Sequence, residues 1–376
     1  MSGKDFANEN RTSVSVSLSA LGENYRAIEA LLSPGVTPLC VIKADAYGHG
    51  AVEVGRRLES MGARYFGVAS ISEGLELRRN LISSPILVLS GIMPWDDLEE
   101  LADHDLTASV INFETLERIG KFHRASSLKI HVKIDTGMGR LGFGLCEVPE
   151  LIRRLKQLKQ VEIEGLMTHF SSSERHDDYG MKQVRDFGSV VRSFKDNGIE
   201  PGFVHMANSA AICTYPEAHF NMVRPGIMLY GSYPDPTLCE RLKLRPVMKW
   251  SSGVAFVRKF SPGISLSYGR TYVTEKETVV AYIPLGYADG YSRGLSNRGI
   301  VLIKGRRCNV VGRVCMDWTF VDVTGVPDVR PGDEVVLLGT AGGETVTADE
   351  MAERIGTIPY EVLCCISRRI PRRYVD

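Results

Sequence analysis

Apolar runs and amphipathic stretches alternate along the first 232 residues of the chain. The runs predict buried strands. The stretches between them, such as 51–62 and 148–160, repeat apolar residues at spacings of three and four, which predicts helices. Eight runs fit this description, at 38–44, 65–70, 85–91, 106–111, 129–135, 162–170, 202–209 and 222–231. Eight strands alternating with helices predict an α/β fold, a (β/α)8 TIM-like barrel over residues 1–235, with chemistry at the carboxyl ends of its strands.

From about residue 236 the pattern changes to alternating apolar and polar positions broken by turn residues. This pattern predicts antiparallel strands, and residues 236–376 are therefore expected to form a separate C-terminal mainly-β domain. The segment SVSVSL at 13–18 alternates in the same way and precedes the first barrel strand. Residues from about 11 to 18 are therefore expected to pair with that domain.

Composition and charge exclude several functions. Lys plus Arg and Asp plus Glu both number 45 in 376 residues, so no basic excess indicates a nucleic acid or an anionic membrane as partner. The polar N-terminus lacks the apolar core of a signal peptide, and no run reaches some 18 apolar residues, which predicts a cytoplasmic protein. Eight cysteines are scattered without a C-x-x-C pair, so neither a disulfide framework nor a metal site is expected.

One lysine stands out in the segment VIKADAYGHG at 41–50, because it directly follows an apolar run. Removing water from an amine is costly unless a partner or a covalent bond replaces the hydration, so Lys43 is a candidate functional residue. The alternative is a strand end that meets solvent, with Gly48 and Gly50 as turn residues.

Other polar residues fall at the ends of the predicted barrel strands. Three further cations, a tyrosine and glycine-rich backbone on one face are what an anionic, phosphorylated cofactor requires. The set comprises Lys43 and Tyr47 at strand 1, Lys133 and Arg140 at strand 5, His169 at strand 6, Asn208 and Ser209 at strand 7, and Arg224, Gly226 and Ile227 on strand 8.

Ten stretches, in order along nearly the whole chain, resemble the alanine racemase family of pyridoxal-phosphate enzymes. They are VIKADAYGHG, VKIDTGMGRLGF, THF, HMANSAA, RPGIMLYG, LSYGR, GYADGY, GRVCMDW, TIPYE and SRRIPRRY. The resemblance implies that the protein interconverts L-alanine and D-alanine and that Lys43 holds the aldehyde of pyridoxal 5'-phosphate as a Schiff base. A covalent imine removes the need to solvate a buried ammonium.

The resemblance also implies a role for each motif residue. Racemisation needs two acid/base groups on opposite faces of the cofactor, and these would be Lys43 on the D-alanine face and Tyr268 on the L-alanine face. Arg224 would face the pyridine nitrogen and disfavour its protonation, and His169 would hydrogen-bond Arg224. For Tyr268 the alternative is an amphipathic residue at a domain boundary, and for His169 a core histidine with its hydrogen bonds satisfied.

Further residues would bind the anionic groups. Arg140 resembles the arginine that contacts the phenolic oxygen of the cofactor and the substrate carboxylate, and Lys133 matches a lysine that is carbamylated in many members. The backbone N–H of Met316 would bind the substrate carboxylate, with ordinary core packing as the alternative. The phosphate would be held by Tyr47, Ser209, the backbone of Gly226 and Ile227, and Tyr360, and Asn208 would be a further cofactor-binding residue.

A substrate channel is implied as well. It would be lined by Tyr287, Arg293, Arg313, Ile358 and Glu174. The family pattern has aspartate in place of Glu174, so the width or gating of the channel is where this chain is expected to differ. The resemblance further implies a homodimer whose active sites are shared between subunits.

The main alternatives are other barrel-type pyridoxal-phosphate enzymes, namely a broad-specificity amino-acid racemase or an amino-acid decarboxylase. A decarboxylase would not need the tyrosine of LSYGR as a second base. A non-catalytic cofactor carrier typically lacks the β domain, and a metal-dependent hydrolase would require a His-x-His motif on the first strand, which is absent. Substrate breadth beyond alanine stays open, as does the choice between supplying D-alanine for peptidoglycan and degrading it.

Overall fold

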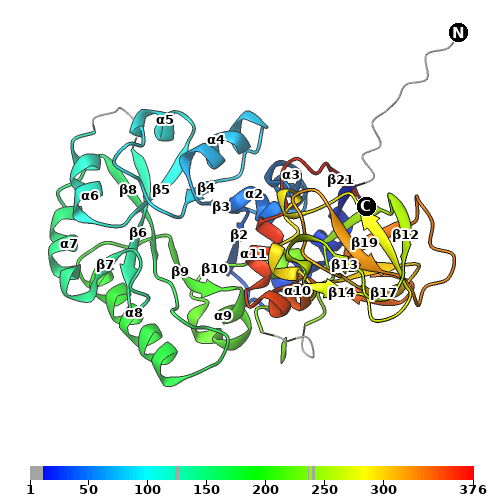
Figure 1. Ribbon diagram of the computed structural model, residues 1–376. Coiled ribbons are helices and arrows are strands. Elements are labelled where there is room, and N and C mark those ends of the chain that lie inside the picture. Colours follow the sequence, from blue (N-terminus) through cyan, green and yellow to red (C-terminus); the bar gives the residue numbers. More distant parts are fainter. Residues whose placement is uncertain (1–11, 123–126, 236, 239–241) are drawn as a thin grey trace, which may run out of the picture. The chain divides into compact units, whose positions relative to one another are not determined.

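The computed structural model describes residues 12–122, 127–235, 237–238 and 242–376, which form two compact units (Figure 1). The barrel unit comprises Leu21–Ala46 and Ala51–Arg245. The β unit comprises the described part of Met1–Ala20, Tyr47–Gly50 and Pro246–Asp376. Residue 236, the expected start of the β domain, and Cys239 lie outside the described residues.

Eight parallel strands close into a barrel, because β5 pairs with β6 as well as with β4. The strands are β2 (Thr37–Val41), β3 (Tyr65–Val68), β4 (Ile86–Val88), β5 (Leu106–Val110), β6 (Leu128–Asp135), β8 (Val161–Met167), β9 (Phe203–Asn208) and β10 (Met222–Arg224), with β7 (Phe143–Gly144) added beside β6. Strands β3, β4 and β5 are buried along their whole length, as expected where helices cover one side and the barrel interior the other. The predicted TIM-like barrel is confirmed.

Helices connect the strands and lie outside them, as Figure 1 shows for α6, α7 and α8. Several begin at an Asn, Asp or Ser whose side chain accepts from a backbone N–H of the first turn, as Asn112 does for α6 and Asp177 for α8. The helices are α1 (Leu18–Glu29), α2 (Lys43–Gly48), α3 (Ala51–Ser60), α4 (Ile71–Arg79), α5 (Leu98–Asp103), α6 (Phe113–Gly120), α7 (Val148–Leu155), α8 (Asp178–Asp196) and α9 (Ser209–Thr214).

The last barrel strand is shorter than its apolar sequence suggested. Strand β10 ends at Arg224, so the expectation that Gly226 and Ile227 lie on it is wrong. Pro225 has no N–H for a ladder, and Gly226 has φ −129° and ψ −94°, outside the strand region. Ile227 begins a short 3-10 helix instead.

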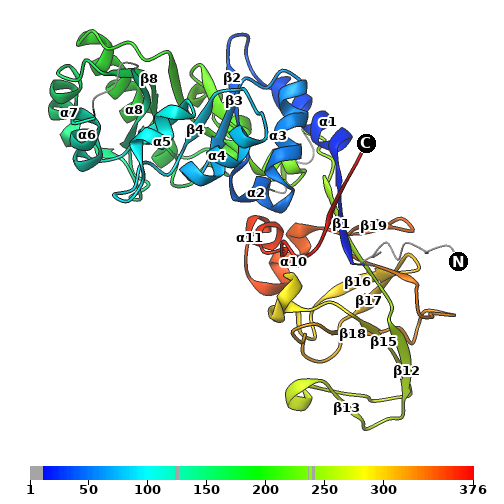
Figure 2. The same ribbon diagram turned by 90° about the horizontal axis from the view of Figure 1, so that it is seen from above.

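The β unit contains a seven-stranded sheet and a smaller three-stranded sheet of β12, β15 and β18 (Figure 2). As expected, the segment at 13–17 belongs here, because β1 pairs antiparallel with β11. Its other neighbour β21 is parallel to it, which differs from the expected all-antiparallel pairing. The remaining elements are β11 (Met248–Gly253), β12 (Phe256–Phe260), β13 (Ser265–Leu266), β14 (Tyr272–Val273), β15 (Thr278–Ile283), β16 (Ile300–Ile303), β17 (Arg306–Asn309), β18 (Thr319–Asp322), β19 (Glu334–Ala341), β20 (Glu344–Val346), α10 (Ala348–Ile355), α11 (Pro359–Cys364) and β21 (Arg372–Val375), with β1 at Ser13–Ser17.

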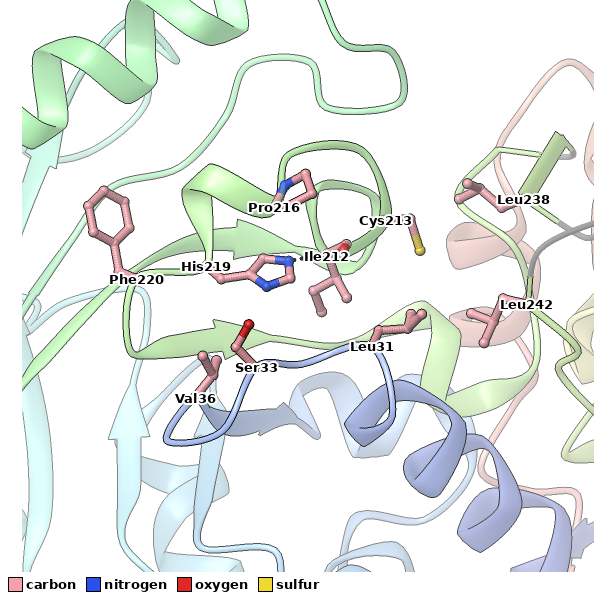
Figure 3. A pocket seen from close by; sticks show the side chains of 10 residues that line it. All are labelled: Leu31, Ser33, Val36, Ile212, Cys213, Pro216, His219, Phe220, Leu238 and Leu242. Atoms are coloured by element: carbon pink, nitrogen blue, oxygen red, sulfur yellow. Dashed lines mark hydrogen bonds between the residues drawn. The ribbon is translucent and has the colours of Figure 1, made fainter.

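A cavity of about 330 Å³ lies in the barrel unit, away from the strand ends where the chemistry is expected (Figure 3). Its wall includes Val36 and Phe220, which precede the amino ends of β2 and β10. His219 Nε2 donates to the carbonyl of Ile212 at 3.0 Å inside this wall, so the cavity histidine already has a structural partner. Among the described residues, no helix combines the length and the apolar character needed to cross a bilayer.

Candidate active site

Polar side chains singled out from the sequence lie at one edge of the barrel. Lys43 and His169 come just after β2 and β8, and Ser209 directly follows β9. Lys133 lies near the end of β6, and Arg224 is the last residue of β10. Because all these strands are parallel and neighbours in one closed sheet, their carboxyl ends share one face of the barrel.

Lys43 begins a turn with unusual backbone geometry. The four following residues, 44–47, are not glycine, yet all have φ between 52° and 54°, so α2 is a left-handed helical turn. Left-handed geometry costs an L-residue about 1 kcal/mol or more. The small side chains of Ala44 and Ala46 are compatible with this left-handed turn. No pattern in the sequence predicted the turn.

Hydrogen bonds from neighbouring segments hold this turn. The Ala46 N–H donates to the carbonyl of Ile42 at 2.9 Å, and the Ala44 N–H donates to the Glu73 carboxylate at 2.9 Å. The Asp45 carboxylate accepts from the N–H of Ala51 at 2.8 Å. These contacts lie on both sides of Lys43 and fix the position of its backbone.

Lys133 is a buried amine among other cations. Its side chain emerges from β6, and the residue is only 7% exposed. Burial, followed by the positive charges of Arg224, Arg140 and Lys43, lowers the pKa of Lys133 to about 8, against a smaller opposing effect of Asp135. Three cations therefore act on one amine, from the end of β10, from the loop after β6 and from the start of α2, and this part of the site carries excess positive charge.

Asp135 organises the loop that carries Arg140. Its Oδ1 accepts from the N–H groups of Gly137, Met138 and Gly139 at 2.8 to 3.1 Å, and its Oδ2 from the N–H of Arg140 at 3.1 Å. Burial alone would raise the pKa of Asp135, but these four bonds lower it overall. The carboxylate is thus used to shape the loop, and the Arg140 residue at its end is exposed.

Arg224 is buried and held by four acceptors. Its Nη2 donates to the carbonyls of Thr168 and Met206 at 2.7 and 2.9 Å and lies 2.9 Å from His169 Nδ1, while Nη1 lies 2.8 Å from His205 Nδ1. Burial and the charge of Arg140 lower the pKa of Arg224 to about 9, which leaves it charged at neutral pH. Burial and the charges of Arg224 and Arg140 hold the pKa of His169 well below its usual range, so His169 is neutral and accepts at Nδ1.

The backbone expected to hold phosphate lies beside the start of α9. Ser209 is buried, and its Oγ accepts from the N–H of Gly226 at 2.8 Å. Asn208 caps α9 by accepting from the N–H of Ala211 at 3.0 Å. The side chain of Ile227 is fully buried, so this residue offers a ligand only its main chain.

Tyr268 projects from the hairpin of β13 and β14 in the β unit. It is 71% exposed, and Ser267 before it and Arg270 after it have φ of 62° and 51°. The Ser267 hydroxyl donates to the carbonyl of Arg313 at 2.6 Å and so ties the turn to the next segment. The left-handed backbone and this hydrogen bond fix the turn in a conformation that leaves the Tyr268 side chain exposed.

Met316 is 54% exposed, so ordinary core packing of this residue is the wrong interpretation. Its carbonyl accepts from the N–H of Ala288 at 3.0 Å, and the carbonyl of Cys315 accepts from the N–H of Tyr287 at 3.0 Å. A Cβ at Gly286 would lie 2.1 Å from the Cys315 oxygen, so only glycine permits this close approach.

The two tyrosines expected at the phosphate meet within the β unit. Tyr47 and Tyr360 have ring centroids 5.8 Å apart at an interplanar angle of 48°. Tyr47 is buried, and burial, followed by the charges of Tyr360 and Cys364, raises the pKa of its hydroxyl. The hydroxyl therefore stays protonated and able to donate.

The predicted channel residues are divided between the units. Glu174 belongs to the barrel unit, where its carboxylate accepts from the Ser173 N–H at 2.9 Å. Four others are at least partly exposed in the β unit: Tyr287, Arg293, Arg313 and Ile358.

The histidine beside Arg224 was not expected from the sequence. His205 lies inside strand β9 in the segment FVHMAN and is fully buried. His205 begins the motif HMANSAA, but its hydrogen-bond partners come from other strands, so the sequence assigned it no role of its own.

Comparisons with known proteins agree with this geometry. Residues 16–234 match the family model for the alanine racemase N-terminal domain, and residues 247–374 that for the C-terminal domain. The chain is 46% identical over 369 residues to an alanine racemase of Carboxydothermus hydrogenoformans, covering 96% of this chain and 98% of that protein.

Two solved structures are also similar. One is an alanine racemase of Clostridium difficile 630, with a TM-score of 0.90 and 40% identity over 97% of this chain and 96% of that one. The other is the alanine racemase of Bacillus anthracis with bound L-Ala-P, with a TM-score of 0.92 and 35% identity over 98% and 95%. The chain therefore belongs to the alanine racemase family, a family of isomerases.

Proposed function

We propose that this enzyme interconverts L-alanine and D-alanine with pyridoxal 5'-phosphate held covalently by Lys43. The observation that carries the proposal is the group of cations at the carboxyl ends of the barrel strands. Burial, followed by the positive charges of Arg224, Arg140 and Lys43, lowers the pKa of Lys133 to about 8. A ligand with several negative charges would relieve this repulsion.

Pyridoxal phosphate fits this donor set because it carries a phosphate and a phenolic oxygen. When bound it would supply an electron sink for the negative charge that develops at the substrate Cα. Arg224 would face its pyridine nitrogen, and the fixed charge of Arg224 would disfavour a proton there. The four acceptors around Arg224 support this role because they hold the guanidinium in one orientation.

The phosphate would be bound by groups at the start of α9 and by the tyrosine pair. Asn208, Ser209 and the main chain of Gly226 and Ile227 would contribute from the barrel unit. Tyr47 and Tyr360 would donate their hydroxyls, and the raised pKa of Tyr47 supports a donor role for it.

Two side chains would move the protons. Lys43 would remove or return the Cα proton on the D-alanine face, and Tyr268 on the L-alanine face, so that the proton leaves one side of Cα and another arrives from the opposite side. Arg140 and the N–H of Met316 would bind the substrate carboxylate. Substrate would reach them along Glu174, Tyr287, Arg293, Arg313 and Ile358.

Lys133 is proposed to react with carbon dioxide. Its neutral amine would attack the carbon and lose a proton, which leaves a carbamate anion among the cations. With a pKa of about 8, roughly a quarter of the amine is neutral at pH 7.5, against about 0.1% for an ordinary lysine. The anion would then hold Arg140 in place for the substrate carboxylate.

The active unit is proposed to be a homodimer with shared sites. Tyr268 and Met316 are 71% and 54% exposed in the single chain. A catalytic base, and an N–H that binds the substrate carboxylate, both work best when they are shielded from water. A partner chain that covers them would complete each site. The cytoplasmic location stays a prediction from the sequence, which cell fractionation would test.

The direct test is incubation of the purified holoenzyme with L-alanine, followed by chiral chromatography. Equal amounts of both enantiomers at equilibrium are expected, because mirror-image molecules have the same free energy. Release of carbon dioxide and an amine would identify a decarboxylase instead. Turnover of larger amino acids at similar kcat/KM on a substrate panel would identify a broad-specificity racemase.

A further inference from the structure

A chain of hydrogen bonds runs from Arg224 into the interior of the barrel. Arg224 Nη1 lies 2.8 Å from His205 Nδ1, and His205 Nε2 lies 2.8 Å from His131 Nδ1. His131 Nε2 lies 3.1 Å from Glu164 Oε2. We call these four residues, from β10, β9, β6 and β8, the histidine chain.

The two ends of the histidine chain determine where its protons lie. A guanidinium only donates, so His205 Nδ1 must accept and its proton must be on Nε2. That N–H faces His131 Nδ1, which must accept in turn, so the proton of His131 is also on Nε2. His131 therefore donates to Glu164, the one member of the chain that only accepts when ionised.

The protonation states agree with this direction. Burial is the largest cause that lowers the pKa of His131, and burial with the charge of Arg224 holds the pKa of His205 well below its usual range, so both rings are neutral. Burial alone would raise the pKa of Glu164, but hydrogen bonds from His131 and Tyr65 lower it overall. Glu164 is thus the anion at the far end.

Neighbouring residues provide hydrogen-bond donors to Glu164 and space for the ring of His131. Glu164 Oε2 also accepts from the hydroxyls of Tyr65 and Thr107 at 2.5 and 3.2 Å, so three donors converge on one oxygen. A Cβ at Gly165 would lie 2.4 Å from His131 Nδ1, so glycine next to Glu164 is what leaves room for the ring. The Gly165 backbone does not require glycine for any other reason, because its φ lies outside the positive range.

We propose that Glu164 is a positioning residue for Arg224. By fixing the tautomers of His131 and then His205, it ensures that His205 presents a lone pair and not an N–H to the guanidinium. Without Glu164, the proton of His131 can move to Nδ1 and donate to His205 Nε2. The proton of His205 must then be on Nδ1, where this N–H and the N–H of Arg224 Nη1 face each other as two donors. The guanidinium then loses one of its four acceptors and its fixed plane. The catalytic part of this inference rests on the proposed contact of Arg224 with the cofactor.

Two substitutions at Glu164 separate its hydrogen bond from its bulk. Glu164→Leu removes the acceptor, and we expect kcat for alanine to fall by about ten- to a hundredfold, the effect of one hydrogen bond to a charged group, with KM within about threefold. Glu164→Gln keeps an amide oxygen for His131 and Tyr65, and we expect kcat within about threefold of wild type. Thr107→Val is the matched control, because it removes a buried bond to the same oxygen but leaves the histidine chain intact.

Nitrogen-15 NMR of the histidine rings in the cofactor-free protein tests the tautomers without reference to activity. Both His131 and His205, identified by loss of their signals in His131→Asn and His205→Asn, should carry the proton on Nε2 in the wild type, in Glu164→Gln and in Thr107→Val. In Glu164→Leu the Nδ1-protonated form should appear.

The outcomes distinguish the inference from the proposed function. An Nδ1 proton on either ring of the wild type overturns the inference, even if Glu164→Leu does not fold. Equal loss of kcat in Glu164→Gln and Glu164→Leu also overturns it. The negative charge of Glu164 would then matter, and the direction of the hydrogen bonds along the histidine chain would not. Tautomers as expected in a protein that does not racemise alanine would leave the histidine chain intact and refute the proposed function alone.

Discussion

Replacing Lys133 with methionine is expected to stabilise the cofactor-free protein in a pH-dependent way. Burial and the neighbouring cations lower the pKa of Lys133 from 10.5 to about 8. This difference corresponds to about 3 kcal/mol against the protonated amine in the folded state. Methionine has a similar length and no charge, so Lys133→Met removes this penalty.

The sign follows from the lower pKa in the folded state. Below pH 8 the amine is protonated in both states and the full penalty applies, whereas above pH 10.5 it is neutral in both and the penalty disappears. The pH-dependent advantage of Lys133→Met should therefore fall from about 3 kcal/mol at pH 7 to about 1 kcal/mol at pH 10. The direction of this change does not depend on how well the methionine packs.

The assay is urea unfolding followed by circular dichroism at pH 7, 8, 9 and 10, in buffers freed of carbon dioxide. Lys129→Met, on the same strand with a side chain 35% exposed, controls for removing a lysine from β6. A difference between wild type and Lys133→Met that stays constant from pH 7 to pH 10 would refute the electrostatic account of the site. Adding bicarbonate near pH 8 should stabilise the wild type and leave Lys133→Met unchanged if the carbamate forms.

Three further predictions concern the proposed chemistry. Borohydride reduction of the holoenzyme should fix the cofactor on Lys43, and peptide mapping that finds it on another lysine would contradict the assignment. In Tyr268→Phe, exchange of the L-alanine Cα hydrogen with solvent deuterium should be lost while D-alanine exchange partly survives; equal loss from both enantiomers would argue against two bases. Mixing inactive Lys43→Ala and Tyr268→Ala subunits should restore about one quarter of wild-type activity, because about half of the dimers are then mixed and each has one intact site. No recovery after confirmed subunit exchange would place both bases in one chain.

Part of the architecture and of the site followed from the sequence. Residue spacing predicted the barrel, because apolar runs and helical periodicity are local properties of the chain. Lys43 was also recognisable as unusual from its neighbours alone, because an amine directly after an apolar run is costly to desolvate. The roles proposed for Arg140, Arg224 and Tyr268 came from motif resemblance, since nothing in their own surroundings in sequence specifies them.

Other features depended on contacts between distant segments. The left-handed turn after Lys43 could not be predicted because residues 44–47 adopt it under hydrogen bonds that include one from Ala44 to Glu73, beyond the neighbouring sequence. The apolar run from 222 continues past Arg224, but strand β10 ends there because the next residues are Pro225 and a Gly226 outside the strand region.

The fold class, the family and the residue types at the strand ends follow from patterns and motifs along the chain. The electrostatics of the site arise only when distant segments come together in the folded barrel. Lys133 has a lowered pKa because it is buried and because Lys43 and Arg224, far away along the chain, are brought to the same end of the barrel. His131 and His205, 74 residues apart, become one directed chain because β6 and β9 both line the barrel interior. Charge and proton direction depend on distances in space, and sequence patterns do not contain those distances.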